Sequence, residues 1–204
     1  ISASFKKFFN LSEPDVYGEP NERYFKSSNS VECYVKVDGT CLVVSYYKEQ
    51  LIARTRGSID FFRYDKTGEL AKVFKPILEK LKSYGPFLRG QVSFLFEAYE
   101  PGIHIVNHGP TPQLTLLNVV VHETYTYYPQ YLVDTLAKAY ELRRPASFSI
   151  GENQPYLTLQ ELLSAVPGFI NHEGLCLYAH DGQVPLKAKT IWWLERNNAA
   201  NAKI

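Results

Sequence analysis

Methionine is absent from this chain of 204 residues, and cysteine occurs only three times. The absence of methionine predicts that Ile1 is not the native start and that residues upstream of it are missing. Cys33, Cys41 and Cys176 form no Cys-x-x-Cys pair, which fits a reducing, cytoplasmic compartment with the thiols as small core hydrophobes. No apolar run approaches ~18 residues and no signal-like start is present, so the sequence predicts no membrane partner.

Net charge is also small, because 22 Lys and Arg against 21 Asp and Glu give +1. This balance argues against a basic coat for nucleic acid, although a local basic groove is compatible with it. With 45% hydrophobic and 21% charged residues, the chain has the composition of a globular protein. The length fits one large domain, expected over residues 1–196 and followed by a polar tail at 197–204. The sequence does not indicate which oligomeric state the protein has.

Strand-forming patterns dominate the chain, since Tyr, Phe and β-branched residues are abundant. The expected strands are 31–35, 40–47, 51–55, 91–98, 114–122, 175–178 and 184–189. Helices are expected at 68–84, with a kink at Pro76 and an end at Gly85-Pro86, at 129–143, and at 158–166 behind a Thr158–Glu161 capping box. The mixture predicts an α+β fold in which antiparallel sheets are flanked by helices.

The stretch Lys36-Val37-Asp38-Gly39-Thr40 lies at the turn between the first two expected strands. A lysine, one spacer and Asp-Gly is typical of enzymes that attach a nucleoside monophosphate to their own lysine. A free lysine has a pKa near ~10.4, so nearby cations or desolvation must favour its neutral, nucleophilic form. Gly39 would allow a sharp turn, and Asp38 would hold metal-bound water or a ribose hydroxyl. The alternative is a surface lysine beside a common hairpin turn.

Two carboxylates and two lysines lie further along the sequence, C-terminal to the Lys36 motif. Glu97 ends an expected strand and Glu173 opens another, and together they suit a hydrated Mg²⁺ or Mn²⁺ that bridges to phosphate. Each is alternatively a solvated glutamate. Lys187 and Lys189 alternate along one strand and share a face, which favours a triphosphate between them. The alternative is an exposed sheet edge that carries lysines.

Basic and aromatic residues add two further candidates. Arg54 and Arg56 are expected to share a strand face and to contact phosphates of RNA or of the nucleotide. The pair Trp192-Trp193 belongs either to the core or to a base-stacking surface, and the core is favoured.

Taken in order, these motifs resemble the covalent nucleotidyltransferases, which are polynucleotide ligases and mRNA capping enzymes. Within them the chain is most similar to the phage-type RNA ligase 1 family, which repairs broken tRNA. Three segments carry this resemblance: Lys7-Phe8-Phe9-Asn10-Leu11, Arg56-Gly57-Ser58-Ile59 and Phe96-Glu97-Ala98-Tyr99-Glu100-Pro101. The family implies the nucleotidyltransferase fold of the ATP-grasp-like ligases and is compatible with a virus-encoded protein.

The resemblance also implies a reaction and a set of roles. Lys36 would attack ATP to form lysyl-AMP, the AMP would move to a 5′-phosphate of RNA, and a 3′-hydroxyl would then seal the strand, with nicked tRNA as one candidate substrate. The implied ATP contacts are Lys7, Lys36, Asp38, Gly39, Arg56, Glu97, Glu173, Lys187 and Lys189, and the implied ligands of Mg²⁺ or Mn²⁺ are Asp38, Glu97 and Glu173.

Three departures from the family pattern define what to expect of this chain. The family's upstream Arg-Gly motif is not found, Trp193 stands where tyrosine is usual, and we expect the C-terminal domain linked to tRNA specificity to be missing. The expectation is therefore an adenylyltransferase domain without its N-terminal part and without a specificity domain. The alternatives are a DNA ligase, a GTP-using capping enzyme, or a non-catalytic RNA-binding relative.

Overall fold

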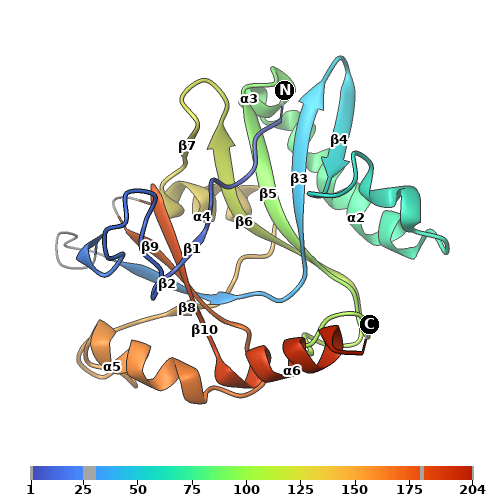
Figure 1. The fold of residues 1–204 in the computed structure, drawn as a ribbon. Helices are drawn as coiled ribbons and strands as arrows, with labels where there is room; N and C mark the ends of the chain where they lie inside the picture. Colours follow the sequence, from blue (N-terminus) through green and yellow to red (C-terminus); the bar gives the residue numbers. More distant parts are fainter. Residues whose placement is uncertain (1, 25–30, 180–181, 204) are drawn as a thin grey trace. The chain divides into compact units, whose positions relative to one another are not determined.

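A computed structural model describes residues 2–24, 31–179 and 182–203, so Ile204 of the expected tail lies outside it. The chain divides into two compact units (Figure 1). The first unit contains residues 1–6, 39–101 and 108–144; the second contains residues 7–38, 102–107 and 145–204. No helix in the described residues is both long and apolar enough to cross a membrane.

The first unit is built on an antiparallel sheet of strand order β4-β3-β5-β6-β7. Its strands are β3 (Thr40–Tyr47), β4 (Gln50–Arg54), β5 (Val92–Tyr99), β6 (Gln113–Val121) and β7 (Thr126–Tyr127). Lys48 and Glu49 form the β3–β4 turn with positive φ angles, which end one strand and reverse the chain. Each strand expected in this unit is present with its ends shifted by one residue at most.

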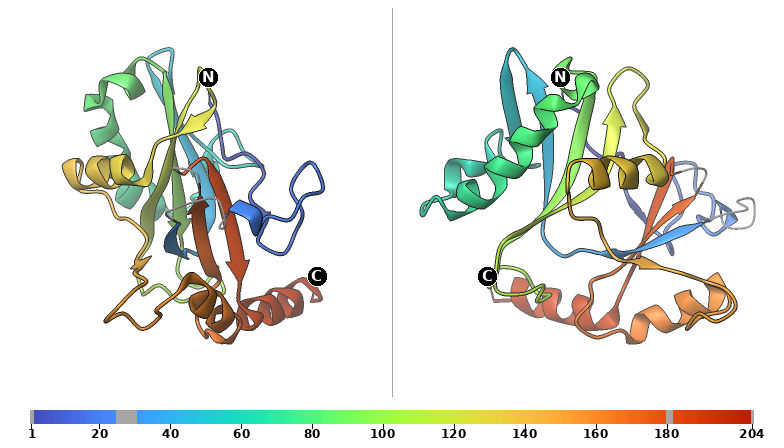
Figure 2. Two further views of the ribbon diagram at one scale, coloured as in Figure 1. Left: turned by 90° about the vertical axis from the view of Figure 1, so that its left-hand side faces the viewer. Right: turned by 180° about the vertical axis from the view of Figure 1, so that it is seen from behind.

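Helices cover one face of this sheet (Figure 2). They are η1 (Phe61–Tyr64), α2 (Glu69–Glu79), η2 (Lys80–Ser83), α3 (Gly85–Leu88) and α4 (Gln130–Ala139). Leu70, Phe74 and Leu78 recur at helical spacing and bury one stripe of α2 against the sheet residues Phe94 and Phe96. This apolar stripe is the main reason that the segment is helical.

Three helix boundaries in the first unit differ from expectation. The helix expected over 68–84 is α-helical only to Glu79 and continues as the 3-10 helix η2 to Ser83. Gly85-Pro86 begins α3 rather than only ending the preceding helix, because proline is tolerated in a first helical turn, where its missing N–H is not needed. The helix expected to reach residue 143 ends at Ala139. Glu141 then adopts a positive φ of 54°, and the Leu142 amide donates to the Ala137 carbonyl to close the helix end.

The second unit contains a sheet of strand order β1-β10-β9-β2-β8. Its strands are β1 (Phe9–Asn10), β2 (Glu32–Lys36), β8 (Ser147–Phe148), β9 (Gly174–Ala179) and β10 (Val184–Lys189). Strand β1 runs parallel to β10, and the other neighbours are antiparallel. The two-residue strands β1 and β8 were not expected, because they are too short to show a period-2 pattern.

The two faces of this second sheet differ in character. On one face Leu177 and Leu186 pack against Leu162 and Val166, which come from α5 (Leu159–Ala165) and η3 (Val166–Gly168). The opposite face carries the aromatic cluster of Tyr34, Cys176 and Tyr178, with Phe8 packed against it. The Thr158–Glu161 capping box at the start of α5 is confirmed.

Helix α6 (Ile191–Asn201) follows β10 directly. The Thr190 hydroxyl caps it by accepting a hydrogen bond from the Trp193 amide. The helix continues through residues 197–201 of the expected polar tail, where alanines at 199 and 200 favour helix. Together the two units confirm the expected α+β class, with antiparallel sheets flanked by helices.

Candidate active site

Lys36 is the last residue of β2 and forms an ion pair within the second unit. Its Nζ lies 2.7 Å from Oε1 of Glu173, the residue immediately before β9. The Lys36 side chain is 18% exposed and the Glu173 side chain only 6%. The Lys36 side chain is therefore partly exposed, whereas its carboxylate partner is held inside the protein.

The strand register brings a second lysine beside this pair. Gly174 is paired with Lys36 on one side and with Lys189 on the other. Residues paired across antiparallel strands project on the same face, so both lysines lie on the face that carries Tyr34 and Tyr178. Lys187 shares this face, as expected from the alternation along β10.

The charges in this cluster influence one another. Burial raises the pKa of the Glu173 carboxyl above its usual range, and Lys36 acts in the opposite direction. Asp38 is near enough to raise the pKa of Glu173 further. Burial lowers the pKa of Lys189, while Glu173 partly offsets this and Lys36 and Lys187 add to it. The second unit thus contains a partly desolvated cluster of three lysines and two carboxylates, namely Lys36, Lys187, Lys189, Asp38 and Glu173.

Asp38 is buried and is engaged by the backbone. Its Oδ2 accepts a hydrogen bond of 2.9 Å from the Val106 amide. The Asn107 amide next to it donates to Oδ1 of Asn171 at 3.2 Å. These two bonds hold the segment 102–107 in the second unit. Sequence reasoning missed this role of Val106, because a backbone donor leaves no signal in the side-chain pattern.

Trp193 is buried, in agreement with the favoured core assignment. The Lys189 Nζ lies 4.3 Å from the centre of a Trp193 ring, a cation–π contact. The indole Nε1 is also buried, and it finds no hydrogen-bond partner within the described part of the chain. The indole thus supports Lys189 through its ring.

Lys7 is exposed, and its aromatic neighbours are anchored. The Lys7 Nζ lies 4.4 Å from the Phe9 ring centre. Phe9 pairs with Leu186 in β1 and packs on the α5 side, whereas Phe8 packs against the aromatic cluster on the other face. The two phenylalanines therefore fix the backbone on either side of the sheet and leave the lysine at the surface.

Three expected site residues belong to the first unit. Glu97 is 9% exposed within β5, so the solvent-facing alternative for it is wrong. A Cβ at Gly39 would lie 2.9 Å from the Glu97 Cγ and 2.6 Å from the Ala98 carbonyl oxygen, so only glycine fits beside this strand. Arg56 is exposed and lies beyond β4, which ends at Arg54.

The expectation that Arg54 and Arg56 share a strand face is therefore wrong. The Thr55 hydroxyl accepts hydrogen bonds from the Gly57 and Ser58 amides, and the Thr55 amide donates to the Ser58 carbonyl. This turn stops the strand after Arg54. A threonine before Arg-Gly-Ser was the signal that sequence reasoning missed.

The charges of the lysines and carboxylates in the second unit are complementary to those of a metal-bound triphosphate. Two nearby carboxylates attract a divalent cation, and three ammonium groups attract phosphate. Across residues 2–24, 31–179 and 182–203, no group of three or more His, Cys, Asp or Glu side chains is placed to hold a metal. A metal here would take its remaining ligands from water and phosphate, as Mg²⁺ commonly does.

Comparison with known proteins adds a family and a fold. The family model described as RNA ligase matches residues 1–194. No curated protein matches the chain. A Naegleria gruberi RNA ligase mutant solved with ATP and Mn shares 15% identity at a TM-score of 0.70, over 96% of this chain and 58% of that one. An archaeal ATP-dependent RNA ligase shares 15% identity at a TM-score of 0.65, over 97% of this chain and 51% of that one.

A second Naegleria gruberi RNA ligase mutant, solved with AMP and Mn, gives a TM-score of 0.69 at 15% identity, over 95% of this chain and 58% of that one. At this identity the likeness to solved structures is one of fold. The chain spans a little over half the length of these proteins.

Proposed function

Because the chain belongs to the phage-type RNA ligase family, we propose that it is an ATP-dependent RNA ligase that joins 5′-phosphate and 3′-hydroxyl ends. Residues 1–196 would serve as its adenylyltransferase domain. The observation that carries this proposal is the partly exposed Lys36 side chain, paired with the buried Glu173 carboxylate and next to Lys189 in the strand register. A nucleophilic amine, a proton acceptor and a phosphate-binding cation are the groups that self-adenylylation requires.

In the first step the Lys36 Nζ attacks the α-phosphorus of ATP, a P–N bond forms and the bond to pyrophosphate breaks. The ammonium must lose a proton before attack, and Glu173 at 2.7 Å is placed to accept it. Lys189 lies beside Lys36 in the strand register, so both side chains can reach the phosphates of one nucleotide. Lys187 and Lys189 would hold the phosphates, with Lys7 and Arg56 as further phosphate contacts.

In the second step an oxygen of the RNA 5′-phosphate attacks the phosphorus of lysyl-AMP, and the P–N bond to Lys36 breaks. In the third step the 3′-hydroxyl attacks the RNA 5′-phosphate, and AMP leaves. Asp38 and Glu173 would hold Mg²⁺ or Mn²⁺, with Glu97 as a further metal or ribose contact, and the metal would neutralise phosphate charge. Repair of broken RNA, with nicked tRNA as a candidate, is the role this chemistry serves.

Self-adenylylation tests the proposal directly. We expect α-labelled ATP with Mg²⁺ or Mn²⁺ to label the protein, peptide mapping to place the label on Lys36, and 5′-phosphorylated RNA to remove it. GTP and 5′-phosphorylated DNA serve as the comparison. A preference for GTP would indicate a capping-type enzyme, and discharge onto DNA alone a DNA ligase. RNA binding without any covalent label would indicate a non-catalytic relative.

Glu173→Gln is expected to slow self-adenylylation about 100-fold, the usual contribution of a positioned proton acceptor. The amide keeps the size of the side chain but accepts no proton and neutralises no metal. The rate of lysyl-AMP formation at saturating ATP measures the effect, and Glu152→Gln in an exposed loop is the control. An unchanged or higher rate would show that the ion pair only restrains Lys36, and would remove Glu173 from the mechanism.

A further inference from the structure

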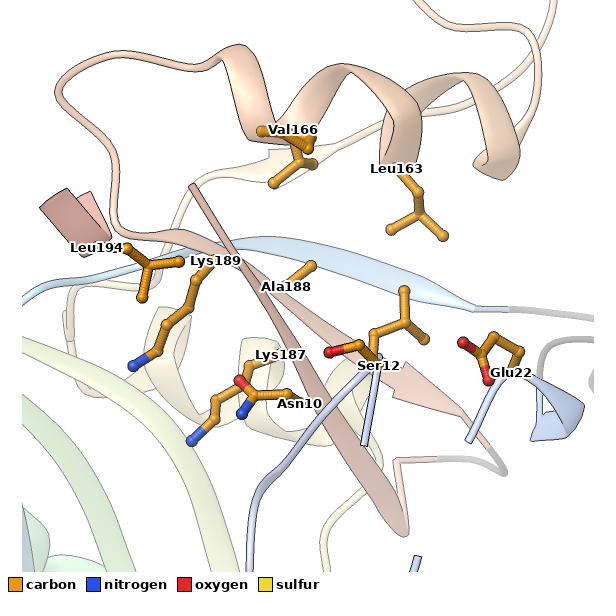
Figure 3. Close-up of a pocket in the computed structure, with 11 residues that line it drawn as sticks. Asn10, Ser12, Glu22, Leu163, Val166, Lys187, Ala188, Lys189 and Leu194 are labelled. Atoms are coloured by element: carbon orange, nitrogen blue, oxygen red, sulfur yellow. The ribbon is translucent and has the colours of Figure 1, made fainter. Parts of the chain in front are cut away.

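A hollow of about 430 Å³ opens at the edge of β10 in the second unit (Figure 3). Strand β1 pairs only with Leu186 and Lys187, so the backbone of Ala188 and Lys189 continues past the end of β1. The hollow lies at this uncovered stretch, which we call the edge hollow. Its other walls come from the turn after β1, from Glu22, from α5 and η3, and from α6.

The edge hollow has an apolar wall and a cationic end. Leu163, Val166 and Leu194 form the apolar wall, and Ala188 forms part of the floor. The Glu22 carboxylate also lines the hollow, on the side away from the amino groups of Lys187 and Lys189 (Figure 3). Figure 3 shows the amino groups of Lys187 and Lys189 directed away from Leu163 and Val166, on the same side as the Asn10 side chain. A ligand that fits must therefore present an apolar part to one wall and an anionic, hydrogen-bonding part to the other end.

A nucleotide has this distribution of groups, and the volume lies within the roughly 300–1,000 Å³ of small-ligand pockets. Its base would face the leucines and valine, and its phosphate would reach the lysines. A terminal 5′-phosphate carries about two negative charges at pH 7, which matches two ammonium groups. An internal phosphodiester carries only one, so a strand end fits the lysine pair better than a strand interior does.

We propose that the edge hollow binds the 5′-terminal nucleotide of the RNA strand that receives AMP, an inference that rests on the proposed function. The register explains why this ligand is distinct from ATP. Lys36 and Lys189 lie on the aromatic face of the sheet, where the α-phosphate of ATP must arrive. The hollow approaches the same lysines from the strand edge and from the α5 side, so a second phosphate reaches them without occupying the first position.

Two substitutions on opposite walls test the inference. Leu163→Trp on α5 and Ser12→Trp on the turn after β1 both add volume to the hollow, and the exposed Ser12 tolerates a large side chain. The matched control is Ile170→Trp, at an exposed position outside the hollow. The rate of lysyl-AMP formation from ATP alone is measured first. The rate at which purified lysyl-AMP protein discharges onto 5′-phosphorylated RNA is measured second.

Both hollow variants are expected to discharge onto RNA about tenfold more slowly or worse, since contacts in an apolar pocket are commonly worth that much. Their lysyl-AMP formation should match that of the Ile170→Trp control. Equal losses in both steps would assign the hollow to ATP and overturn the inference. Unchanged discharge in both variants would show that no RNA end binds there.

A direct RNA-binding measurement tests the edge hollow without requiring the proposed ligase chemistry. Fluorescence anisotropy compares a 5′-phosphorylated RNA with the same RNA ending in a 5′-hydroxyl. The unchanged protein is expected to prefer the phosphorylated end, and both hollow variants are expected to lose this preference. If the protein forms no lysyl-AMP yet shows this pattern, the proposed chemistry fails, whereas binding of a 5′-phosphorylated RNA end in the edge hollow is supported. If the preference is absent, or survives in both variants, the inference fails.

Discussion

Lys36→Ala is expected to lower transfer of label from ATP to the protein at least about 10³-fold, as removal of a covalent nucleophile does. The structure gives the reason, because the Lys36 Nζ belongs to a partly exposed side chain and is paired with a buried carboxylate. Lys189 lies in register beside it but stacks on Trp193. A neighbouring lysine is therefore not expected to take over the attack.

Lys36→Arg sharpens this expectation. Arginine keeps the positive charge and can still pair with Glu173, but it stays protonated at any working pH and offers no nucleophilic amine. It should be as inactive as alanine while preserving the ion pair, so an equal loss in both variants points to chemistry rather than to folding. Lys138→Ala, at an exposed position of α4, is the control.

The third step gives a positive readout for the same variants. As proposed, sealing of an RNA that already carries 5′-AMP needs no amine at position 36. Both Lys36 variants are therefore expected to join pre-adenylylated RNA to a 3′-hydroxyl strand at a measurable rate in a gel assay. Label transfer that persists in Lys36→Ala would contradict the assignment of the nucleophile.

Strands and the short motifs between them were the predictable part of this molecule. The alternation of apolar residues set the strands around Lys36 and Lys187 to within one residue, and the lysine spacing on β10 set their common face. Both features depend only on local period-2 geometry. The motifs singled out Lys36, Glu173 and Lys189, and the register of β2, β9 and β10 brings these residues together.

Burial and backbone contacts could not be predicted in this way. The sequence left Glu97 and Glu173 open as solvated residues, and the structure buries both, because burial depends on which strands become neighbours. Arg56 lies outside β4, because three hydrogen bonds of the Thr55 turn end the strand at Arg54. Asp38 was predicted for ligand chemistry, yet its Oδ2 accepts from the Val106 amide, a partner 68 positions away in the sequence.

Gly174→Ala is expected to destabilise the second unit by roughly 3 kcal/mol or more, through overpacking and backbone strain together. A Cβ at this position would lie 1.9 Å from the Ala188 carbonyl oxygen and 2.8 Å from the Lys189 Cα. Both obstacles are backbone atoms of the neighbouring strand, so no side-chain rotation relieves the clash. The φ of 157° adds strain for any residue with a side chain.

Urea unfolding measures this cost, and the chain offers a matched control in the same unit. Gly168→Ala meets no atom within 4 Å and has no positive φ, so it should change stability little. The clash would separate β9 from β10, and with them the Lys36, Gly174 and Lys189 register, so lysyl-AMP formation should fall along with stability. A Gly174→Ala protein as stable as the Gly168→Ala control would show that β9 and β10 do not approach as described. It would also remove the geometric basis for placing Lys189 beside the nucleophile.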